Sequence, residues 1–450
     1  MRKGGIELFG YSMVQLVRTH AHKLDKPLRE KVLNQYKPFK WTPCFLHKMF
    51  EGFIKRTKKL SVIIEFEEGC YEEGYDQVRE IFSNHFGCKV RHEFTSVSCC
   101  SAQMTPSALE KVLTTCSQVR KIYINREVHA LLDTAVAASN ARDVVRNGTT
   151  LTGEGVTIAV IDTGVYPHED LSGRIVDFVD FINQRSDPYD DNGHGTHCAG
   201  DALGDGSASD ERYRGPAPKA NLVGIKVLNK LGSGSLETVM QGVEYCIDYN
   251  ESNPENRIDV INLSLGSPAL RYENENEDPM VRIVNQAWDA GIVVCVAAGN
   301  SGPEFETIAS PGVSQQVITV GALDDRDTVE REDDDVASFS SRGPTVYGDR
   351  KPDILAPGVN IVSLRSPKSF IDKLQKGNRV GTNYITLSGT SMATPICAGI
   401  VALMLEHDPT LTPNQVKERL KAGTDLWNNL EEPEVYIYGA GYINAENSIP

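Results

Sequence analysis

The feature that most constrains this chain is a series of short, almost uninterrupted apolar runs that alternate with amphipathic stretches from Val156 onward. The runs cover residues 156–161, 222–227, 258–263, 292–297 and 317–320. Strands need to be apolar on both faces when helices cover both sides of a sheet. Periodic helices are predicted between them at 236–247 and 280–290, the second closed by Gly291. The alternation predicts an α/β fold with a parallel sheet flanked by helices.

A different pattern precedes this region, in residues 60–132. A strand is predicted at 61–66, a helix at 75–86, extended runs at 89–94 and 96–103, a helix after Thr105-Pro106, and a strand at 121–124. The order βαββαβ is that of a small α+β, ferredoxin-like module. We therefore expect three parts: a basic N-terminal extension at 1–59, the module at 60–132 and the α/β domain at 133–450.

Charge is unevenly distributed along the chain. Residues 1–60 hold 14 Lys and Arg against 4 Asp and Glu, whereas the whole chain carries a net charge of −15. We expect the basic segment to form a solvated helical extension, with contact to anionic lipid or to the acidic body as the alternative. An acidic molecule repels a phosphate backbone, so nucleic acid is not expected as a partner.

Two further observations bear on location. The apolar stretch 396–405 is about half as long as a bilayer crossing requires, so no membrane span is expected. The first 19 residues lack an uninterrupted apolar core, and none of the ten cysteines forms a CxxC pair. Thiols in apolar runs, such as Cys295, persist most easily in a reducing compartment. We expect a cytoplasmic protein.

Reactive side chains follow the predicted strands, where open α/β sheets bind ligands. Asp162 ends the first strand, His194 and His197 lie among small residues, and Ser391 precedes an apolar helix. Taken singly, Asp162 is compatible with a polar residue that ends a strand with its hydrogen bonds satisfied. Ser391 is compatible with a serine that caps the N-terminus of a helix. The two histidines lack a third nearby ligand, which disfavours a metal site.

The three segments together point to nucleophilic catalysis. A serine hydroxyl needs a base to remove its proton, and the base needs a carboxylate to orient it. The segments 161–164, 194–197 and 389–393 occur in the order Asp, His, Ser that subtilisin uses. From about residue 133 to 448 the chain thus resembles the subtilisin-like serine peptidases.

The resemblance implies roles for further residues. Asn300 would donate to the tetrahedral oxygen with the Ser391 backbone N–H, and His194 would be the base while His197 is structural. Substrate-binding segments would include residues 232–234, 264–266 and 298–299, which are Gly232, Ser233, Gly234, Ser264, Leu265, Gly266, Ala298 and Gly299. The chemistry would need no cofactor, and proteins or peptides would be the substrates.

A finer resemblance is to the AprX-type intracellular subtilases of bacilli, because of the basic N-terminal region and of cysteines such as Cys198. The module at 60–132 resembles the subtilase propeptide, an intramolecular chaperone and inhibitor. This implies a zymogen that cleaves itself near residues 130–133. A structural calcium ion through Asp170 is possible, and the acidic insertions 273–278 and 324–335 are expected to be solvated loops.

Two functions from different classes are compatible with these residues. The first is an active serine endopeptidase that cuts unfolded or loop segments of proteins. The alternative is a catalytically silent subtilase fold that acts as a binding or chaperone-like protein. The presence of Asp162, His194, Ser391 and Asn300 together favours the enzyme, because a silent descendant has no physical need of all four.

Overall fold

A computed structural model describes residues 12–36, 44–67, 69–95, 98–124, 132–425 and 431–450. The chain divides into two compact units, the N-terminal unit Met1–Val128 and the C-terminal unit His129–Pro450. The predicted cleavage segment 130–133 falls at this division, and residues 125–131 lie outside the described part of the chain. Leu132 begins the helix α6 (Leu132–Ala138).

The N-terminal unit contains a four-stranded antiparallel sheet in the order β2-β3-β1-β4. Its elements follow the predicted order: β1 (Leu60–Phe66), α4 (Tyr71–Ser83), β2 (Lys89–Phe94), β3 (Cys99–Met104), α5 (Pro106–Thr115) and β4 (Val119–Ile124). The Thr105 hydroxyl accepts from the Ala108 N–H, which caps α5 as the Thr-Pro pair indicates. The β-α-β-β-α-β order predicted from the periodicity is therefore present.

The basic segment contributes to the core of this unit. Its helices are α1 (Ser12–Thr19), α2 (Lys26–Tyr36) and α3 (Cys44–Thr57). Leu28, Val32 and Tyr36 of α2 are buried with the sheet residues because their spacing of four places them on one helical face. Leu24, which precedes α2, is buried in the same cluster. The Asp25 carboxylate accepts the Ile124 N–H at 3.2 Å, beside the edge strand β4. The expected solvated extension thus differs from the structure, in which the described helices pack on the module.

The C-terminal unit is built on an eight-stranded sheet that is parallel except for β13. Its order is β13-β12-β11-β10-β7-β9-β8, with β14 also paired to β12. The strands are β7 (Thr157–Asp162), β8 (Ile175–Asp180), β9 (Asn221–Lys226), β10 (Val260–Leu263), β11 (Val293–Ala297), β12 (Ile318–Asp324), β13 (Asp335–Val336) and β14 (Ile354–Pro357). Strands β7, β10 and β11 are buried along their whole length, which confirms the predicted α/β class.

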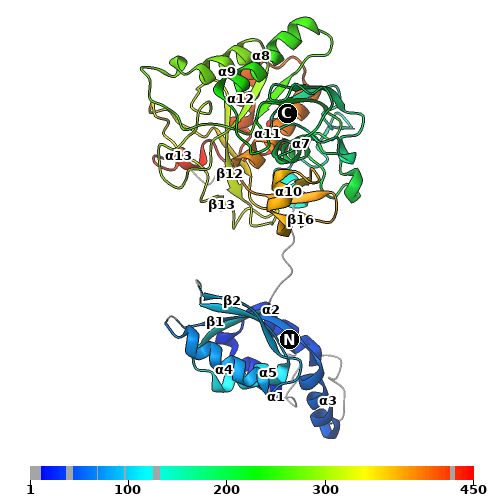
Figure 1. The fold of residues 1–450 in the computed structure, drawn as a ribbon, viewed down its shortest axis with the longest axis vertical. Helices are drawn as coiled ribbons and strands as arrows, with labels where there is room; N and C mark the ends of the chain where they lie inside the picture. Colours follow the sequence, from blue (N-terminus) through cyan, green and yellow to red (C-terminus); the bar gives the residue numbers. More distant parts are fainter. Residues whose placement is uncertain (1–11, 37–43, 68, 96–97, 125–131, 426–430) are drawn as a thin grey trace, which may run out of the picture. The chain divides into compact units, whose positions relative to one another are not determined.

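Helices surround this sheet in Figure 1. They are α7 (His194–Leu203), α8 (Leu236–Ser252), α9 (Pro279–Asp289), α10 (Phe370–Leu374), α11 (Thr390–His407), α12 (Pro413–Ala422), α13 (Val435–Tyr438) and α14 (Ala445–Ser448), with 3-10 turns at Glu169–Leu171, Ser207–Ser209, Glu275–Glu277 and Lys376–Asn378. A second sheet has the order β15 (Ile361–Leu364), β17 (Tyr384–Leu387), β16 (Arg379–Val380), and β5 (Val145–Arg146) pairs with β6 (Thr149–Thr150). Gly291 follows α9 with φ +86°, as the predicted C-terminal cap requires.

Helix α11 runs through the centre of the C-terminal unit. It spans 18 residues, so it is longer than the ten-residue apolar stretch considered in the sequence, and within the described residues it has the length and hydropathy of a membrane span. However, 83% of its residues are buried inside the fold, against the strands β10, β11 and β12. Its apolar character is accounted for by this packing.

Candidate active site

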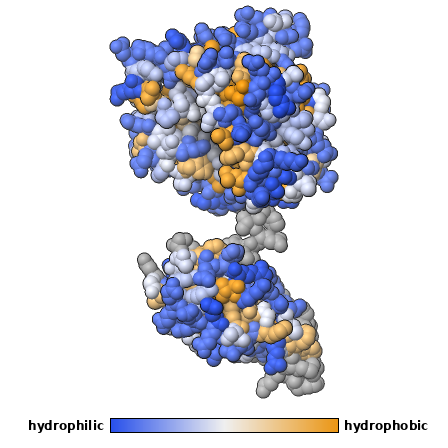
Figure 2. Space-filling model, viewed as in Figure 1, coloured by the Kyte–Doolittle hydropathy of each residue, from blue (hydrophilic) through white to orange (hydrophobic). Residues whose placement is uncertain are grey.

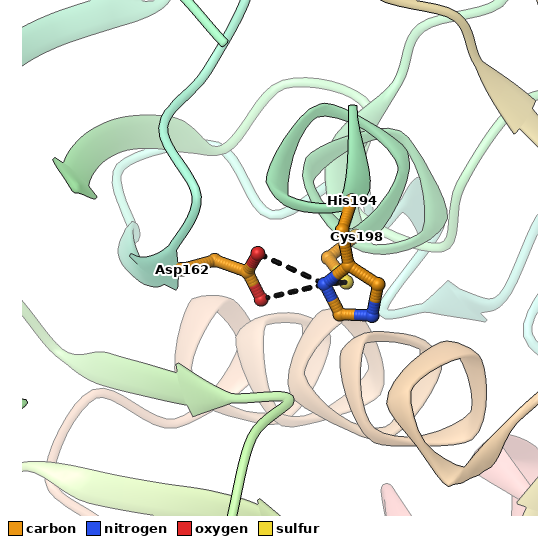
Figure 3. A group of neighbouring side chains, drawn as sticks. All are labelled: Asp162, His194 and Cys198. Atoms are coloured by element: carbon orange, nitrogen blue, oxygen red, sulfur yellow. Dashed lines mark hydrogen bonds and ion pairs between the residues drawn. The ribbon is translucent and has the colours of Figure 1, made fainter. Parts of the chain in front are cut away.

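A carboxylate and an imidazole meet at the carboxyl end of the central strand. Asp162 is the last residue of β7 and is fully buried, while His194 is the first residue of α7. The His194 Nδ1 lies 2.9 Å from both Asp162 oxygens, and its other ring nitrogen points away from the carboxylate (Figure 3). At Gly195 a Cβ would stand 2.2 Å from the Gly164 carbonyl oxygen, so glycine is needed for α7 to approach β7 this closely.

A second buried carboxylate holds the loop before His194. Asp190 accepts hydrogen bonds from the backbone N–H groups of residues 192, 193 and 196 and from the hydroxyls of Thr163 and Thr196, at 2.7–3.0 Å. Because these donors come from both strand end and helix start, Asp190 fixes the position of His194 relative to Asp162. This residue was not singled out in the sequence, although only residues 191–193 separate it from His194.

Ser391 occupies the first turn of α11, and Pro395 lies four residues later. Proline has no N–H, so the Ser391 carbonyl receives no intrahelical hydrogen bond from that position. It accepts instead from the Ser264 hydroxyl at 2.8 Å and from the Cys198 thiol at 3.4 Å. Because of Pro395, the Ser391 carbonyl is free to accept these two hydrogen bonds. They connect Ser391 to the loop after β10 and to the helix α7.

The Ser391 hydroxyl donates to the Ser264 carbonyl oxygen at 3.0 Å. Among the described residues it makes no hydrogen bond to His194. Without substrate, hydrogen bonds between catalytic groups are often long or absent and form in the reacting complex. A rotation about χ1 of Ser391 would let its hydroxyl donate to the His194 imidazole in place of the Ser264 carbonyl oxygen.

The Asn300 side chain is oriented by the start of α11. Its Oδ1 accepts from the Thr390 N–H at 2.9 Å and from the Thr390 hydroxyl at 3.1 Å. The Nδ2 group is left as the donor end of this amide. Asn300 and Ser391 line the same cavity, of about 390 Å³, so an amide donor and a hydroxyl face one space.

Electrostatics favour the protonated form of His194. Burial disfavours the imidazolium, but the negative charge of Asp162 and its hydrogen bond outweigh this and raise the His194 pKa well above its usual value. The Cys198 Sγ lies 3.8 Å from the same Nδ1, and burial raises the pKa of this thiol to about 11. The imidazole is thus a stronger base than an isolated histidine.

A second cavity, of about 650 Å³, adjoins the first. His194 and the predicted substrate residues Gly232, Ser233, Gly234 and Ser264 line it, while Leu265 and Gly266 line both cavities. Gly299 lines the first cavity. Ala298 differs from the expectation: it is fully buried in a separate apolar cluster, and neither cavity includes it.

His197 has the structural surroundings expected of it. It is fully buried, with Nδ1 2.9 Å from the Asp201 carboxylate and Nε2 3.1 Å from two backbone carbonyl oxygens, those of Ile361 and Ile385. These contacts link α7 to the second sheet. Neither nitrogen faces a cavity lined by Ser391.

Two places in the described residues bear on metal binding. The ligand atoms of Asp162, His194 and Cys198 lie within 4.8 Å of one another, a spacing that a thiophilic cation could bridge. Such an ion would bind His194 Nδ1 and break its hydrogen bond to Asp162. Asp162 could then no longer orient His194 for proton transfer. Asp170 is engaged otherwise: its oxygens accept from the Ala208 N–H at 2.9 Å and the Tyr384 hydroxyl at 2.7 Å.

Lys226 is another residue that sequence reasoning missed. Its ammonium group is fully buried and donates to the Thr163 carbonyl, the Asp191 carboxylate and the Leu228 carbonyl at 2.5–2.9 Å. It joins the segments that follow β7 and β9 to the loop before His194. A lysine inside the apolar run 222–227 is the signal that could have found it, because a buried ammonium needs partners.

Comparison with known proteins shows which family the chain resembles. The model of the Subtilase family matches residues 153–441. The serine protease AprX of Bacillus subtilis (strain 168) is 65% identical over 443 residues, which cover 98% of this chain and all of that protein. A thermostable alkaline protease of Halalkalibacterium halodurans is 33% identical over 86% of this chain and 91% of its own length. Among solved structures, Sphericase shares a TM-score of 0.55 and 30% identity over 71% of this chain and 99% of its own.

Proposed function

Since the chain belongs to the subtilase family and is a subtilisin-like serine protease, we propose that it is an endopeptidase that acts through an acyl-enzyme on Ser391. His194 is the general base, and Asp162 orients it and stabilises the imidazolium. The observation that carries the proposal is the His194 Nδ1, held 2.9 Å from both Asp162 oxygens while the rest of the ring borders the substrate cavity. The substrates are unfolded or loop segments of proteins.

The reaction proceeds in two halves. As Ser391 Oγ attacks the peptide carbonyl carbon, its proton passes to His194 Nε2, and a tetrahedral oxyanion forms. His194 then donates this proton to the departing amine, the C–N bond breaks, and the ester to Ser391 remains. Water, deprotonated by the same nitrogen, attacks the ester, and Ser391 recovers its proton when the acid product leaves. Neither half requires a cofactor.

The oxyanion receives two donors. The Asn300 Nδ2 is one, because Thr390 already engages the Oδ1 end of this amide. The backbone N–H of Ser391 is the other, since the first N–H groups of a helix have no intrahelical acceptor. Both donors are in place before substrate binds, so little reorganisation is needed when charge develops on the oxygen.

The test replaces the nucleophile. Ser391→Ala should abolish hydrolysis of a fluorogenic peptide without changing the unfolding temperature by more than a few degrees, because only the hydroxyl is lost. Ser388→Ala is the matched control, since Ser388 is an exposed serine of the same segment and should leave kcat/KM unchanged. Hydrolysis by Ser391→Ala at the wild-type rate would exclude Ser391 as the nucleophile.

We further propose that the chain is a zymogen whose N-terminal unit inhibits the C-terminal unit until the connector is cut. The division of the chain at residue 128 and the α+β topology of the N-terminal unit support this. The apolar residues Ala130 and Leu131 lie between Ile124, which ends β4, and α6. A segment of this kind can add as a strand along residues 232–234 and present a bond to Ser391.

Autoprocessing has a direct measurement. Purified wild-type protein should begin near residues 130–133 by N-terminal sequencing, and the Ser391→Ala protein should retain Met1. The released N-terminal unit, added back to the mature enzyme, should inhibit peptide hydrolysis. An intact Met1 in a preparation that hydrolyses peptides at full rate would refute cleavage as the route to activity.

We propose a cytoplasmic location. Nine of the ten cysteines are free thiols in the part of the chain whose side chains the structure describes, and Cys295 and Cys397 remain unbonded with their sulfur atoms 3.9 Å apart. A reducing compartment preserves such thiols.

A further inference from the structure

The connection between β12 and β13 (Figure 1), residues 324–335, is an acidic loop. It contains eight Asp and Glu against two Arg. Hydrophilic side chains cover most of the face of the C-terminal unit shown in Figure 2, so an exposed carboxylate needs no special partner. A carboxylate of the acidic loop that the fold buries does need one, because a buried charge costs free energy unless it is paired.

Two carboxylates of the acidic loop have a buried oxygen that no donor satisfies. Asp325 is only 2% exposed, and its Oδ2 has no hydrogen-bond partner among the described residues. Within the same part of the chain, the buried Oδ1 of Asp334 also has none. Buried polar atoms are nearly always hydrogen-bonded, so two such oxygens in one loop indicate a binding partner other than a side chain or backbone group of this chain.

The two carboxylates lie close enough to repel each other. Burial raises the Asp325 pKa to about 7, and the neighbouring negative charges, that of Asp334 among them, add to this shift. Burial likewise raises the Asp334 pKa to about 6, although the positive charge of Arg331 opposes the shift. Two negative charges that are poorly solvated and near one another favour a cation between them.

The two arginines of the acidic loop are engaged by other groups. Arg326 pairs with Asp324 at 2.8 Å. Arg331 donates to the Ala138 carbonyl oxygen at 2.6 Å and pairs with the Asp425 carboxylate at 3.0 Å. Neither arginine donates a hydrogen bond to the two buried oxygens. A cation from outside the chain is therefore needed to neutralise them.

The ligand atoms select the class of ion. Carboxylate oxygens suit hard cations such as Ca²⁺, and residues 324–335 contain no His or Cys for a softer metal. Among the described residues, no three of these carboxylates bring their oxygens within 4.8 Å of one another, so the loop is not a complete cage. Ca²⁺ suits such a site, because it takes backbone carbonyls and water as further ligands in a flexible geometry, whereas Mg²⁺ demands a near-ideal octahedron.

We propose that the acidic loop is a Ca²⁺ site in which Asp325 Oδ2 and Asp334 Oδ1 are ligands. The site is separate from peptide hydrolysis and does not depend on the proposed endopeptidase function. The ion neutralises two buried charges and so stabilises the loop. Because Arg331 of this loop donates to the Ala138 carbonyl at the end of α6, the ion also supports the attachment of that helix.

The experiment measures Ca²⁺ binding to the full-length Ser391→Ala protein, a background chosen to prevent self-digestion. Protein freed of metal with a chelator is titrated with Ca²⁺ by calorimetry, and its unfolding temperature is measured with and without the ion. Ca²⁺ at about 100 times its dissociation constant should raise the unfolding temperature of the C-terminal unit by roughly 4 °C. Adding Asp325→Asn or Asp334→Asn should remove one bound ion and this increase. Adding Glu332→Gln, which neutralises an exposed residue of the same loop, should keep both.

Stability in chelator separates loss of the ion from damage to the fold. Without Ca²⁺ the Asp325→Asn protein should be at least as stable as its parent, because a buried unpaired charge has been removed. Two results would overturn the site. One is a parent protein that binds no Ca²⁺, and the other is an Asp325→Asn protein that binds as many Ca²⁺ ions as the parent with the same gain in unfolding temperature.

Discussion

The amide of Asn300 is oriented by its own protein before any substrate arrives, because Thr390 satisfies the Oδ1 end. The Asn300 amide should therefore stabilise the transition state and should not increase the affinity for substrate. We expect Asn300→Ala to lower kcat by about 100- to 1000-fold, the range known for the oxyanion asparagine of a subtilisin, with little change in KM.

The control for this variant is its unfolding temperature, since Thr390 loses a hydrogen-bond acceptor. A drop in kcat without a comparable loss of stability supports the oxyanion role. An unchanged kcat in folded Asn300→Ala would show that Asn300 does not stabilise the oxyanion.

The interaction of His194 with Asp162 predicts a pH dependence. The base acts as the neutral imidazole, so kcat/KM should rise with pH through the His194 pKa, which lies well above 6.5 in the wild type. Asp162→Asn removes the negative charge, so the inflection should move to lower pH and the maximal rate should fall by orders of magnitude. The measurement is a pH profile of kcat/KM for both proteins, and an unmoved inflection would contradict the assignment.

The same pair has a consequence for folding. A histidine whose pKa is raised in the folded state stabilises that state fully below its unfolded pKa, and this contribution is lost as pH rises through the folded pKa. The pH range in which His194 becomes an active base is therefore the range in which its interaction with Asp162 stops adding stability. Activity and stability are opposed at this residue.

At the scale of elements, the connection between β12 and β13 departs from the solvated loop expected for residues 324–335. Asp325 is only 2% exposed, and among the described residues its Oδ2 has no hydrogen-bond partner. Burial, and then the charges of Asp327, Asp334 and Asp324, raise its pKa to about 7. An acidic run in the sequence does not reveal which of its members the fold will bury.

This carboxyl predicts a stability change with pH. The folded state holds the Asp325 proton more tightly than the unfolded state, so stability should fall as pH rises from about 4 to about 7. Asp325→Asn should remove this dependence and stabilise the C-terminal unit at pH 8 by on the order of 2–4 kcal/mol. The measurement is chemical denaturation of Ser391→Ala proteins with and without this substitution, in the presence of a chelator. Equal slopes with pH would show that Asp325 is not the group responsible.

The sequence predicted elements best where one periodicity dominates. The apolar runs indicated β7, β10 and β11, and Gly291 indicated the end of α9. It could not predict α10, because five residues are too few to show a helical period. Nor could it predict that Pro395 frees the Ser391 carbonyl for Ser264, because that depends on how a loop and a helix meet in three dimensions.

At the scale of the whole molecule, the basic segment shows why domain boundaries are hard to read from composition. The shift in charge near residue 59 indicated a separate part, yet Leu24, Leu28 and Val32 share one core with the sheet of the N-terminal unit. An amphipathic stripe shows that a helix buries one face, and not which surface covers it. The two compact units divide at residue 128 instead.

The role of Ser391 as the nucleophile of a working triad can be checked by labelling that serine. The enzyme is treated with a serine-directed fluorophosphonate and digested, and the modified peptide is sequenced by mass spectrometry. We expect a single adduct on Ser391, formed in step with the loss of peptide hydrolysis and slowed strongly in His194→Ala. Hydrolysis that persists after Ser391 is fully modified, or an adduct on another serine that tracks the loss of activity, would contradict it.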